Sequence, residues 1–314
     1  MGVGGSSDEH QEFIDAVADL VRGDLSQLES CIVFGEASSI GETAARFRCH
    51  YIRSDPNGIP RLNALAKQLA RLAVFHCIPR RTIDAVRDEP DFYQQQLMSN
   101  DNAREARRLF TKNQPKSGEG GELLLYALLE HGLGVPQILS KMAMKSNENV
   151  QYQGTDGIHA KILENGNLAL YWGEAKIWKS LSAALTDCFR SITPFLLRQS
   201  EDQDVWLIKQ YADLGDRDLK DRVLRYFDDS QPESANVEIR GACLVGFSVD
   251  QYPNLPEDEA ALKATMATQV ETWKAQVAKR IKKNSVNSFQ IEVFFLPLPD
   301  ADVFRTAILE AVAK

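Results

Sequence analysis

The spacing of apolar residues separates the chain into two stretches with different rhythms. In the first stretch, Leu62, Leu65 and Leu69 recur every three or four positions, which predicts an amphipathic helix over 61–76. Apolar and polar residues alternate over 44–53, which predicts a strand. Further helices are predicted over 9–22, 80–98 and 101–112, and a further strand over 31–34.

A run of turn-forming residues at 113–121, Asn-Gln-Pro-Lys-Ser-Gly-Glu-Gly-Gly, interrupts this pattern. It predicts a division into an N-terminal α/β region, 1–115, and a second domain, 116–314. In the second domain, helices are predicted over 121–131, 181–198, 214–228, 257–283 and 300–313, and strands over 137–144, 156–163, 168–178, 237–249 and 289–297. A hairpin followed by helical crossovers predicts a mixed sheet flanked by helices, an α/β (α+β) fold.

Two carboxylates and a lysine are predicted to meet on one hairpin. The turn Glu164-Asn165-Gly166-Asn167 joins the strands 156–163 and 168–178, because Asn-Gly tolerates positive φ. Asp156 and Glu174 are equally far from Asn165 in the sequence, so the turn pairs them almost directly. Lys176 follows Glu174 by two residues and therefore shares its face of the strand, whereas Ala175 points the opposite way.

This arrangement suits a magnesium site that hydrolyses a phosphodiester. Asp156 and Glu174 supply hard oxygen ligands, the Ala175 carbonyl is a further candidate ligand, and Lys176 can orient water and stabilise charge on phosphorus. The alternative is an ordinary surface ion pair of small energetic value. The strand 168–178 is too apolar to be freely solvated, and burying such charges costs several kcal/mol without partners, which favours function.

Composition and charge indicate the class of protein and the compartment in which this site would act. Of the 314 residues, 44% are hydrophobic and 25% charged, as in ordinary globular proteins. The five cysteines are scattered without a CxxC pair, which argues against a zinc site or a disulfide framework and favours a reducing cytoplasm. No apolar run approaches the length of a membrane span. With a net charge of −8, a chain that acts on DNA must confine its basic residues to one face or let a partner hold the nucleic acid.

The motif Asp156…Glu174-Ala175-Lys176, with a glutamate-bearing helix upstream, resembles the PD-(D/E)xK nuclease superfamily. More narrowly, Gly-Thr-Asp-Gly-Ile-His at 154–159 and Tyr-Trp-Gly-Glu-Ala-Lys at 171–176 resemble the nuclease subunit of the Hachiman anti-phage defence system, the HamA type. The resemblance implies a restriction-endonuclease-like core that binds Mg²⁺, with Mn²⁺ as a substitute. Asp156 and Glu174 would bind the metal and Lys176 would assist the attacking water. Thr155 stands where the superfamily pattern usually has proline.

The resemblance also implies an accessory carboxylate and a protein partner. Glu122, inside the first helix of the second domain, would complete the metal site or orient water, and Glu119 is its competitor. The partner would be a superfamily 2 ATP-dependent helicase that holds the nuclease inactive until it engages DNA. Residues 1–115 would then be a docking or regulatory part.

Other interpretations of the sequence remain open at this point. The chain could be a non-catalytic interaction subunit of a helicase complex, or a stand-alone restriction-type nuclease, which the acidic charge disfavours. Lys179 and Arg190 follow the motif and could contact DNA phosphates, although a solvated helix face explains them equally well. His159 is expected to lie on the opposite side of its strand from Asp156, as a core or surface histidine.

Overall fold

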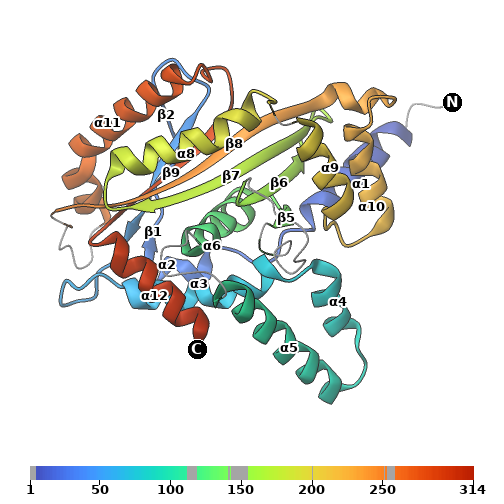
Figure 1. Ribbon diagram of the computed structural model, residues 1–314, viewed down its shortest axis with the longest axis horizontal. Helices are drawn as coiled ribbons and strands as arrows, with labels where there is room; N and C mark the ends of the chain where they lie inside the picture. Colours follow the sequence, from blue (N-terminus) through green and yellow to red (C-terminus); the bar gives the residue numbers. More distant parts are fainter. Residues whose placement is uncertain are drawn as a thin grey trace.

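The protein contains a seven-stranded mixed sheet covered by helices on both faces, which confirms the predicted α/β class (Figure 1). The computed structural model describes residues 5–111, 119–140, 142, 155–199, 201–250, 252 and 259–314. The strand order is β2-β3-β9-β8-β7-β6-β5. The strands are β2 (Ser38–Ser39), β3 (Arg46–Cys49), β5 (Gln137–Ser140), β6 (Gly157–Ile162), β7 (Leu168–Trp178), β8 (Val237–Ser248) and β9 (Ile291–Leu298).

The middle of the sheet is parallel and its two edges are antiparallel. β7 pairs with β8, β8 with β9, and β9 with β3 in parallel, whereas β6 runs antiparallel to both β5 and β7. The predicted hairpin and the later parallel crossovers are therefore confirmed. Two short strands, β1 (Ile32–Val33) and β4 (Tyr51–Ile52), form a separate antiparallel pair.

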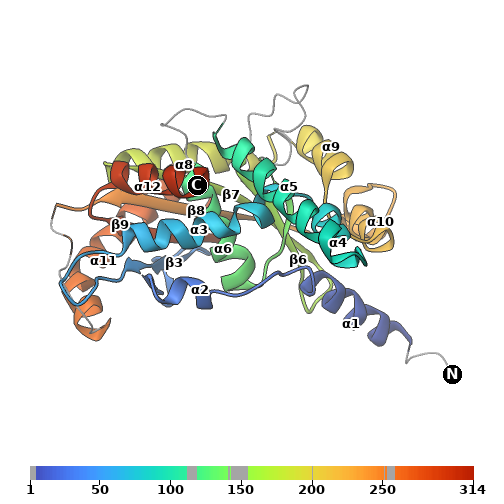
Figure 2. The same ribbon diagram turned by 90° about the horizontal axis from the view of Figure 1, so that it is seen from below.

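Helices from distant parts of the chain cover the two faces (Figures 1 and 2). One face packs against α3, α5, α6 and α12, and the other against α8 and α11, with α1, α9 and α10 at its β5–β6 end. The helices are α1 (Gly5–Ala18), α2 (Ser26–Glu29), α3 (Leu62–Cys77), α4 (Arg80–Asp88), α5 (Phe92–Thr111), α6 (Glu119–Ala127), α8 (Leu181–Leu196), α9 (Glu201–Tyr211), α10 (Arg217–Leu224), α11 (Glu259–Lys283) and α12 (Ala301–Ala313).

The side chains of β7 alternate between these two layers. Tyr171 and Ala175 lie in the hydrophobic cluster that contains α3, α6 and α12. Leu170 and Trp172 lie in the cluster that contains α1, α9 and α10. A strand buried on both faces reads as a continuous apolar run, which explains why the bounds of β7 agree with those expected from the sequence.

Several predictions about the elements were wrong. The predicted helix 80–98 ends at Asp88, and α5 begins at Phe92, because Pro90 cannot continue a helix. The predicted strand 44–53 is divided between β3, in the large sheet, and β4, in the small one. Helix α9 was not predicted at all, since its charged sequence shows no clear apolar stripe.

The predicted boundary near residue 115 falls among residues 112–118, which lie outside the described residues. The regions on either side of it share one sheet, because β3 pairs with β9. They also share one hydrophobic cluster, in which α3 packs against α12. A separate docking role for residues 1–115 therefore stays a prediction, and those residues contribute directly to the core that supports β7.

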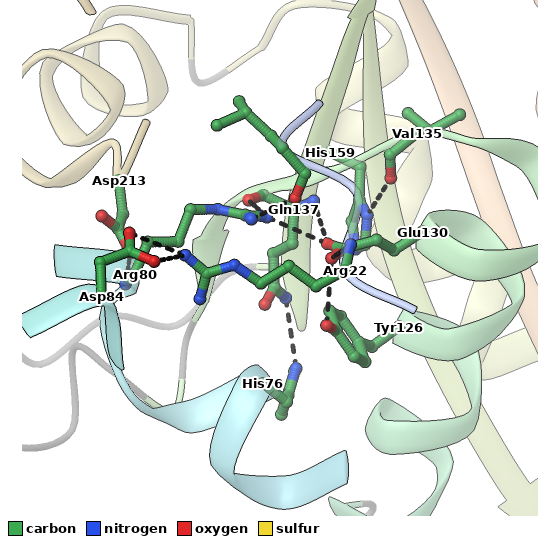
Figure 3. A network of polar contacts seen from close by, with 11 residues as sticks. Arg22, His76, Arg80, Asp84, Tyr126, Glu130, Val135, Gln137, His159 and Asp213 are labelled. Carbon is green, nitrogen blue, oxygen red and sulfur yellow. Dashed lines mark hydrogen bonds and ion pairs between the residues drawn. The ribbon is translucent and has the colours of Figure 1, made fainter. Parts of the chain in front are cut away.

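A fully buried glutamate ties the N-terminal segment to the sheet (Figure 3). Glu130 lies in the π-helical turn Leu128–Gly132 that continues α6, and none of its surface is exposed. Its carboxylate accepts hydrogen bonds from the backbone N–H of Arg22 at 3.1 Å, the Tyr126 hydroxyl at 3.1 Å and the backbone N–H of Gln137 at 2.8 Å. The Arg80 guanidinium completes the set at 3.2 Å. Each of the two buried carboxylate oxygens therefore has hydrogen-bond donors, so its burial leaves neither of them unsatisfied.

The two arginines extend this network to α4 and to the loop after α9. Arg80 donates to the Gln137 carbonyl oxygen at 3.0 Å and to the Leu20 carbonyl oxygen, and its backbone N–H donates to Asp213. Arg22 donates to both carboxylate oxygens of Asp84 at 3.0 Å. These contacts connect segments that are far apart in the sequence, so the network fixes the position of β5 beside β6.

His159 is a core histidine on the face of β6 opposite to Asp156, as the strand alternation predicted. Only 2% of its surface is exposed, and its Nδ1–H donates to the Val135 carbonyl oxygen at 2.9 Å. Burial lowers the pKa of His159 to about 4, so the ring is neutral at pH 7. This residue therefore belongs to the packing around Tyr126 rather than to a metal site.

Replacing Glu130 by leucine should strongly destabilise the protein, because Arg80 would remain buried without its carboxylate. We expect the free energy of unfolding, measured by urea denaturation, to fall by about 3–5 kcal/mol. The double variant with Arg80→Met should lose less than the sum of the two single losses, since it removes both buried charges. Additive losses would show that the two side chains do not interact.

Candidate active site

The β6–β7 ladder ends one residue short of Asp156 and Glu174. It runs from the pair Ile162–Leu168 to the pair Gly157–Gly173. Beyond it, the backbone N–H of Asp156 donates to the Gly173 carbonyl oxygen at 3.0 Å, and the Asp156 carboxylate contacts the Ala175 N–H, so Asp156 lies beside this part of β7. The direct pairing of Asp156 with Glu174 stays a prediction.

The turn that sets this register has the predicted chemistry. Gly166 adopts a φ of +84°, which favours glycine, and its N–H donates to the Leu163 carbonyl oxygen at 2.8 Å. The Asn165 side chain accepts a hydrogen bond from the Asn167 N–H at 3.0 Å. Local turn geometry therefore fixes which residues face each other at the far end of the hairpin.

Asp156 is held against β7 by hydrogen bonds from its own neighbourhood. Its Oδ2 accepts from the Ala175 backbone N–H at 2.9 Å, and only 5% of the residue is exposed. The preceding Thr155 donates from its hydroxyl to the Gly173 carbonyl oxygen. Thr155, which replaces the usual proline, thus anchors the start of β6 through a side-chain hydrogen bond that proline could not make.

Glu174 and Lys176 form an ion pair on the same face of β7 as Asp156. The side chain of Glu174 is 4% exposed and that of Lys176 is 24% exposed. Burial disfavours the charged form of Lys176, but the carboxylates of Asp156 and Glu174 outweigh it and raise the pKa of Lys176 above its ordinary value. Lys176 is therefore a permanent cation between two buried carboxylates.

Helix α8 covers this face of the strand, and α6 covers the other. The thiol of Cys188, in α8, donates to the Glu174 carbonyl oxygen at 3.4 Å. On the opposite face, a Cβ added at Gly121 would lie 3.1 Å from the Ala175 Cβ, so α6 crosses β7 at Ala175 without room for a side chain. The candidate site is consequently enclosed between two packed helices.

The proposed accessory carboxylate comes from α6. Glu122 follows Gly121 and is 5% exposed, whereas the side chain of Glu119 lies outside the described residues. Within the described part of the chain, no group of three His, Cys, Asp or Glu side chains is placed to hold a metal ion. The described contacts join Glu174 to Lys176 and Asp156 to the Ala175 N–H, and the role of Glu122 as an accessory carboxylate stays a prediction.

The two residues considered for DNA contact are both exposed and both paired with carboxylates. Lys179 Nζ lies 2.9 Å from Asp302 Oδ2, and Arg190 lies 2.9 Å from Asp187 one turn earlier in α8. Solvent-exposed ion pairs of this kind contribute little to stability. A role of Lys179 or Arg190 in DNA binding stays a prediction.

Sequence reasoning missed a cavity beside the candidate site, because α9, which forms one of its walls, was not predicted. The cavity has a volume of about 570 Å³, and Trp172, Phe195, Trp206 and Tyr226 contribute to its lining. The sequence signal that could have indicated it is the set of aromatic residues in the otherwise polar stretch 201–228.

Comparison with known proteins identifies the family. Among the helices of the described residues, none is both long enough and apolar enough to cross a membrane. Neither a curated protein nor a solved structure matches the chain. The HamA family model matches residues 29–312, which is most of the chain and includes Asp156, Glu174 and Lys176. The chain therefore belongs to the HamA family, whose members are component A of the Hachiman anti-phage defence system.

Proposed function

We propose that this chain is a Mg²⁺-dependent DNA endonuclease of the PD-(D/E)xK type. One observation carries the proposal. The buried Asp156 carboxylate contacts β7 at the Ala175 N–H, and the buried Glu174 next to Ala175 forms an ion pair with Lys176. A catalytic site that accepts a phosphodiester needs this combination of anionic ligands and a cation at one point of a rigid sheet.

The donor set suits a hard divalent cation. Asp156 and Glu174 offer carboxylate oxygens, and the Ala175 carbonyl oxygen points to the same edge of β7 as the Ala175 N–H that contacts Asp156. These groups would hold Mg²⁺, or Mn²⁺ in its place, with Glu122 as an accessory carboxylate. The bound ion would polarise the phosphoryl group and lower the pKa of a water molecule.

Lys176 would contribute a fixed positive charge. Its raised pKa keeps the ammonium protonated, so it acts as a cation and hydrogen-bond donor rather than as a general base. When a phosphate group approaches, the ammonium can donate to a phosphate oxygen and to the attacking water. The negative charge that develops on phosphorus would thereby be stabilised in a site from which bulk water is largely excluded.

The partner that we propose is a superfamily 2 ATP-dependent helicase. Membership of the HamA family makes the chain a component of the Hachiman system. The net charge of −8 is consistent with a complex in which the helicase binds the DNA and this chain cleaves it. In this complex, the helicase would keep the nuclease inactive until it engages DNA.

A second function, a non-catalytic subunit that regulates the helicase, is favoured by one observation. Both site carboxylates already have protein partners, since Asp156 accepts from the Ala175 N–H and Glu174 pairs with Lys176. An enzyme would have to exchange at least part of these contacts for metal coordination. The two functions differ in whether substitutions in the site abolish phage protection.

The substitutions Glu174→Gln and Lys176→Met should abolish DNA cleavage while leaving the fold intact. We expect degradation of plasmid DNA by the chain with its helicase, Mg²⁺ and ATP to slow by about 10²–10³-fold or more, because each removes a charge that acts on the reacting phosphate. Glu164→Gln, in the exposed hairpin turn, is the matched control. EDTA should stop cleavage and Mn²⁺ should restore it.

Two results would contradict this proposal. Cleavage that persists in Glu174→Gln or Lys176→Met would show that the site is assigned to the wrong residues. Phage protection that persists in both variants, with no cleavage by the unmodified protein, would favour the regulatory subunit.

The two candidate accessory carboxylates can be separated by a matched pair of substitutions. Glu122→Gln should reduce the cleavage rate by at least about tenfold, because a buried carboxylate near the metal would be neutralised. Glu119→Gln, three residues earlier on α6, should leave the rate within about twofold. The reverse order of effects would assign the role to Glu119, and equal, small effects would remove α6 from the site.

A further inference from the structure

A cavity lies beside the candidate site on the same face of the sheet. Its floor is formed by β7 and β8, and its walls by the end of α8, by α9 and by the 3₁₀ turns Arg225–Phe227 and Pro232–Asn236. Its volume of about 570 Å³ lies within the range of small-molecule sites. Trp172 in the floor precedes Glu174 by two residues, so the two side chains are about 7 Å apart along the strand.

Aromatic side chains dominate the lining of this cavity. Trp172 stacks on Phe195 with ring centroids 4.7 Å apart and an angle of 7° between the ring planes. Trp206, in α9, also lines the cavity and is 50% exposed, so the cavity reaches the protein surface. A large aromatic ring held half in water is a common feature of binding sites, because it offers a flat apolar surface.

The indole ring of Trp172 forms part of the floor of the cavity. Trp172 is 3% exposed, and its Nε1 is buried without an acceptor among the residues that the structure describes. Because this nitrogen is inaccessible to solvent, Trp172 supports the lining and does not donate to a ligand. The surface that the cavity offers to a ligand is therefore mainly the exposed ring of Trp206.

Positive charge lies at the border of the cavity. Arg198 and Lys209 both line it, with Asp229 as the one carboxylate among the lining residues. Arg198 has a φ of +53°, and among the described non-glycine residues only Ser285 shares this left-handed conformation. A position that follows a helix end in this conformation usually carries glycine, and strain of this kind is retained where the side chain has a function.

We propose that this cavity binds an unpaired nucleobase of the DNA strand that enters the active site. The base would stack on the aromatic lining, while Arg198 and Lys209 contact the neighbouring phosphates. Stacking on aromatic side chains together with cations along the backbone is how proteins bind single strands without sequence preference. Trp172 and Glu174 are close enough along β7 for one DNA strand to place a base in the cavity and the adjacent phosphate at the active site.

This inference rests on the proposed nuclease function for its substrate, and it specifies that substrate further. A base can enter the cavity only after it has left the duplex, so the enzyme should act on opened DNA rather than on intact double helix. A helicase partner supplies strands in that state. Preference for unpaired DNA would then reside in this chain as well as in its partner.

Binding can be tested with the full-length chain in EDTA, where no cleavage occurs. The probe is a fluorescently labelled single-stranded oligodeoxynucleotide at low salt, compared with an oligonucleotide of equal length and charge built from abasic sites. The unmodified chain should bind the base-containing strand about tenfold more tightly. Trp206→Ala should remove most of this preference and leave binding of the abasic strand unchanged.

Matched variants separate binding from stability. Phe92→Ala removes another exposed aromatic residue, on α5, which packs on the opposite face of the sheet, and it should keep the tenfold preference. Arg198→Gly should weaken binding of both strands while raising the melting temperature, since it relieves the left-handed backbone.

Several results would overturn the proposal. Equal affinity of the unmodified chain for both strands, or an unchanged preference in Trp206→Ala, would show that no base enters the cavity. Binding of free thymidine monophosphate by the unmodified chain, without binding of the oligonucleotide, would assign the cavity to a free nucleotide instead. Base preference without any cleavage in the presence of the helicase, Mg²⁺ and ATP would leave the cavity assignment standing and contradict the nuclease function, so the two can fail separately.

Discussion

Six residue pairs hold β6 against β7, from Ile162–Leu168 beside the turn to Gly157–Gly173 at the other end. This ladder decides which side chains of the hairpin face α8 and which face α6. A slip of one residue would move Glu174 and Lys176 to the other face of the sheet and separate them from Asp156. The same slip would turn each apolar residue of β7 from one face of the sheet to the other, where it would no longer fit its neighbours. Packing on both faces therefore disfavours a slip of the register on which the site depends.

Buried charge occurs at two places near this hairpin, and the surroundings distinguish their roles. Glu130 is satisfied by four donors from the protein itself and is fully enclosed, which marks a structural contact. Glu174 instead pairs with Lys176, whose side chain is 24% exposed, and Asp156 accepts from the Ala175 N–H. Of these two arrangements, the second has the more exposed cation, which can reach an incoming phosphate. In the function that we propose, the chain uses buried carboxylates both to join distant segments and to form a reactive centre.

The hairpin could be predicted because its determinants are local. Asn165 and Gly166 specify the turn, and the apolar run of β7 marks a strand buried on both faces, so the register of the pairs up to Gly157–Gly173 follows by counting residues. Family resemblance added the expected roles of these residues, and the match over residues 29–312 confirms the family.

The remaining features depend on contacts that the sequence pattern does not encode. The pairing of β3 with β9 joins segments more than 200 residues apart, and the Glu130 network collects groups from four elements. Helix α9 has a charged sequence, and its residues Leu207 and Ile208 can be recognised as core residues only from their packing in the cluster that includes β6 and β7. Trp172 packs in the core, and its position in the floor of a cavity is seen only in the structure.

The central claim is that Asp156 and Glu174 together form a divalent-cation site. Electron paramagnetic resonance of Mn²⁺ titrated into the isolated chain measures this directly, because bound Mn²⁺ loses the signal of the free ion. The account predicts a site that is lost when Asp156→Asn is introduced and that Mg²⁺ displaces in the unmodified protein. Equal Mn²⁺ binding by the unmodified protein and by Asp156→Asn would contradict the account.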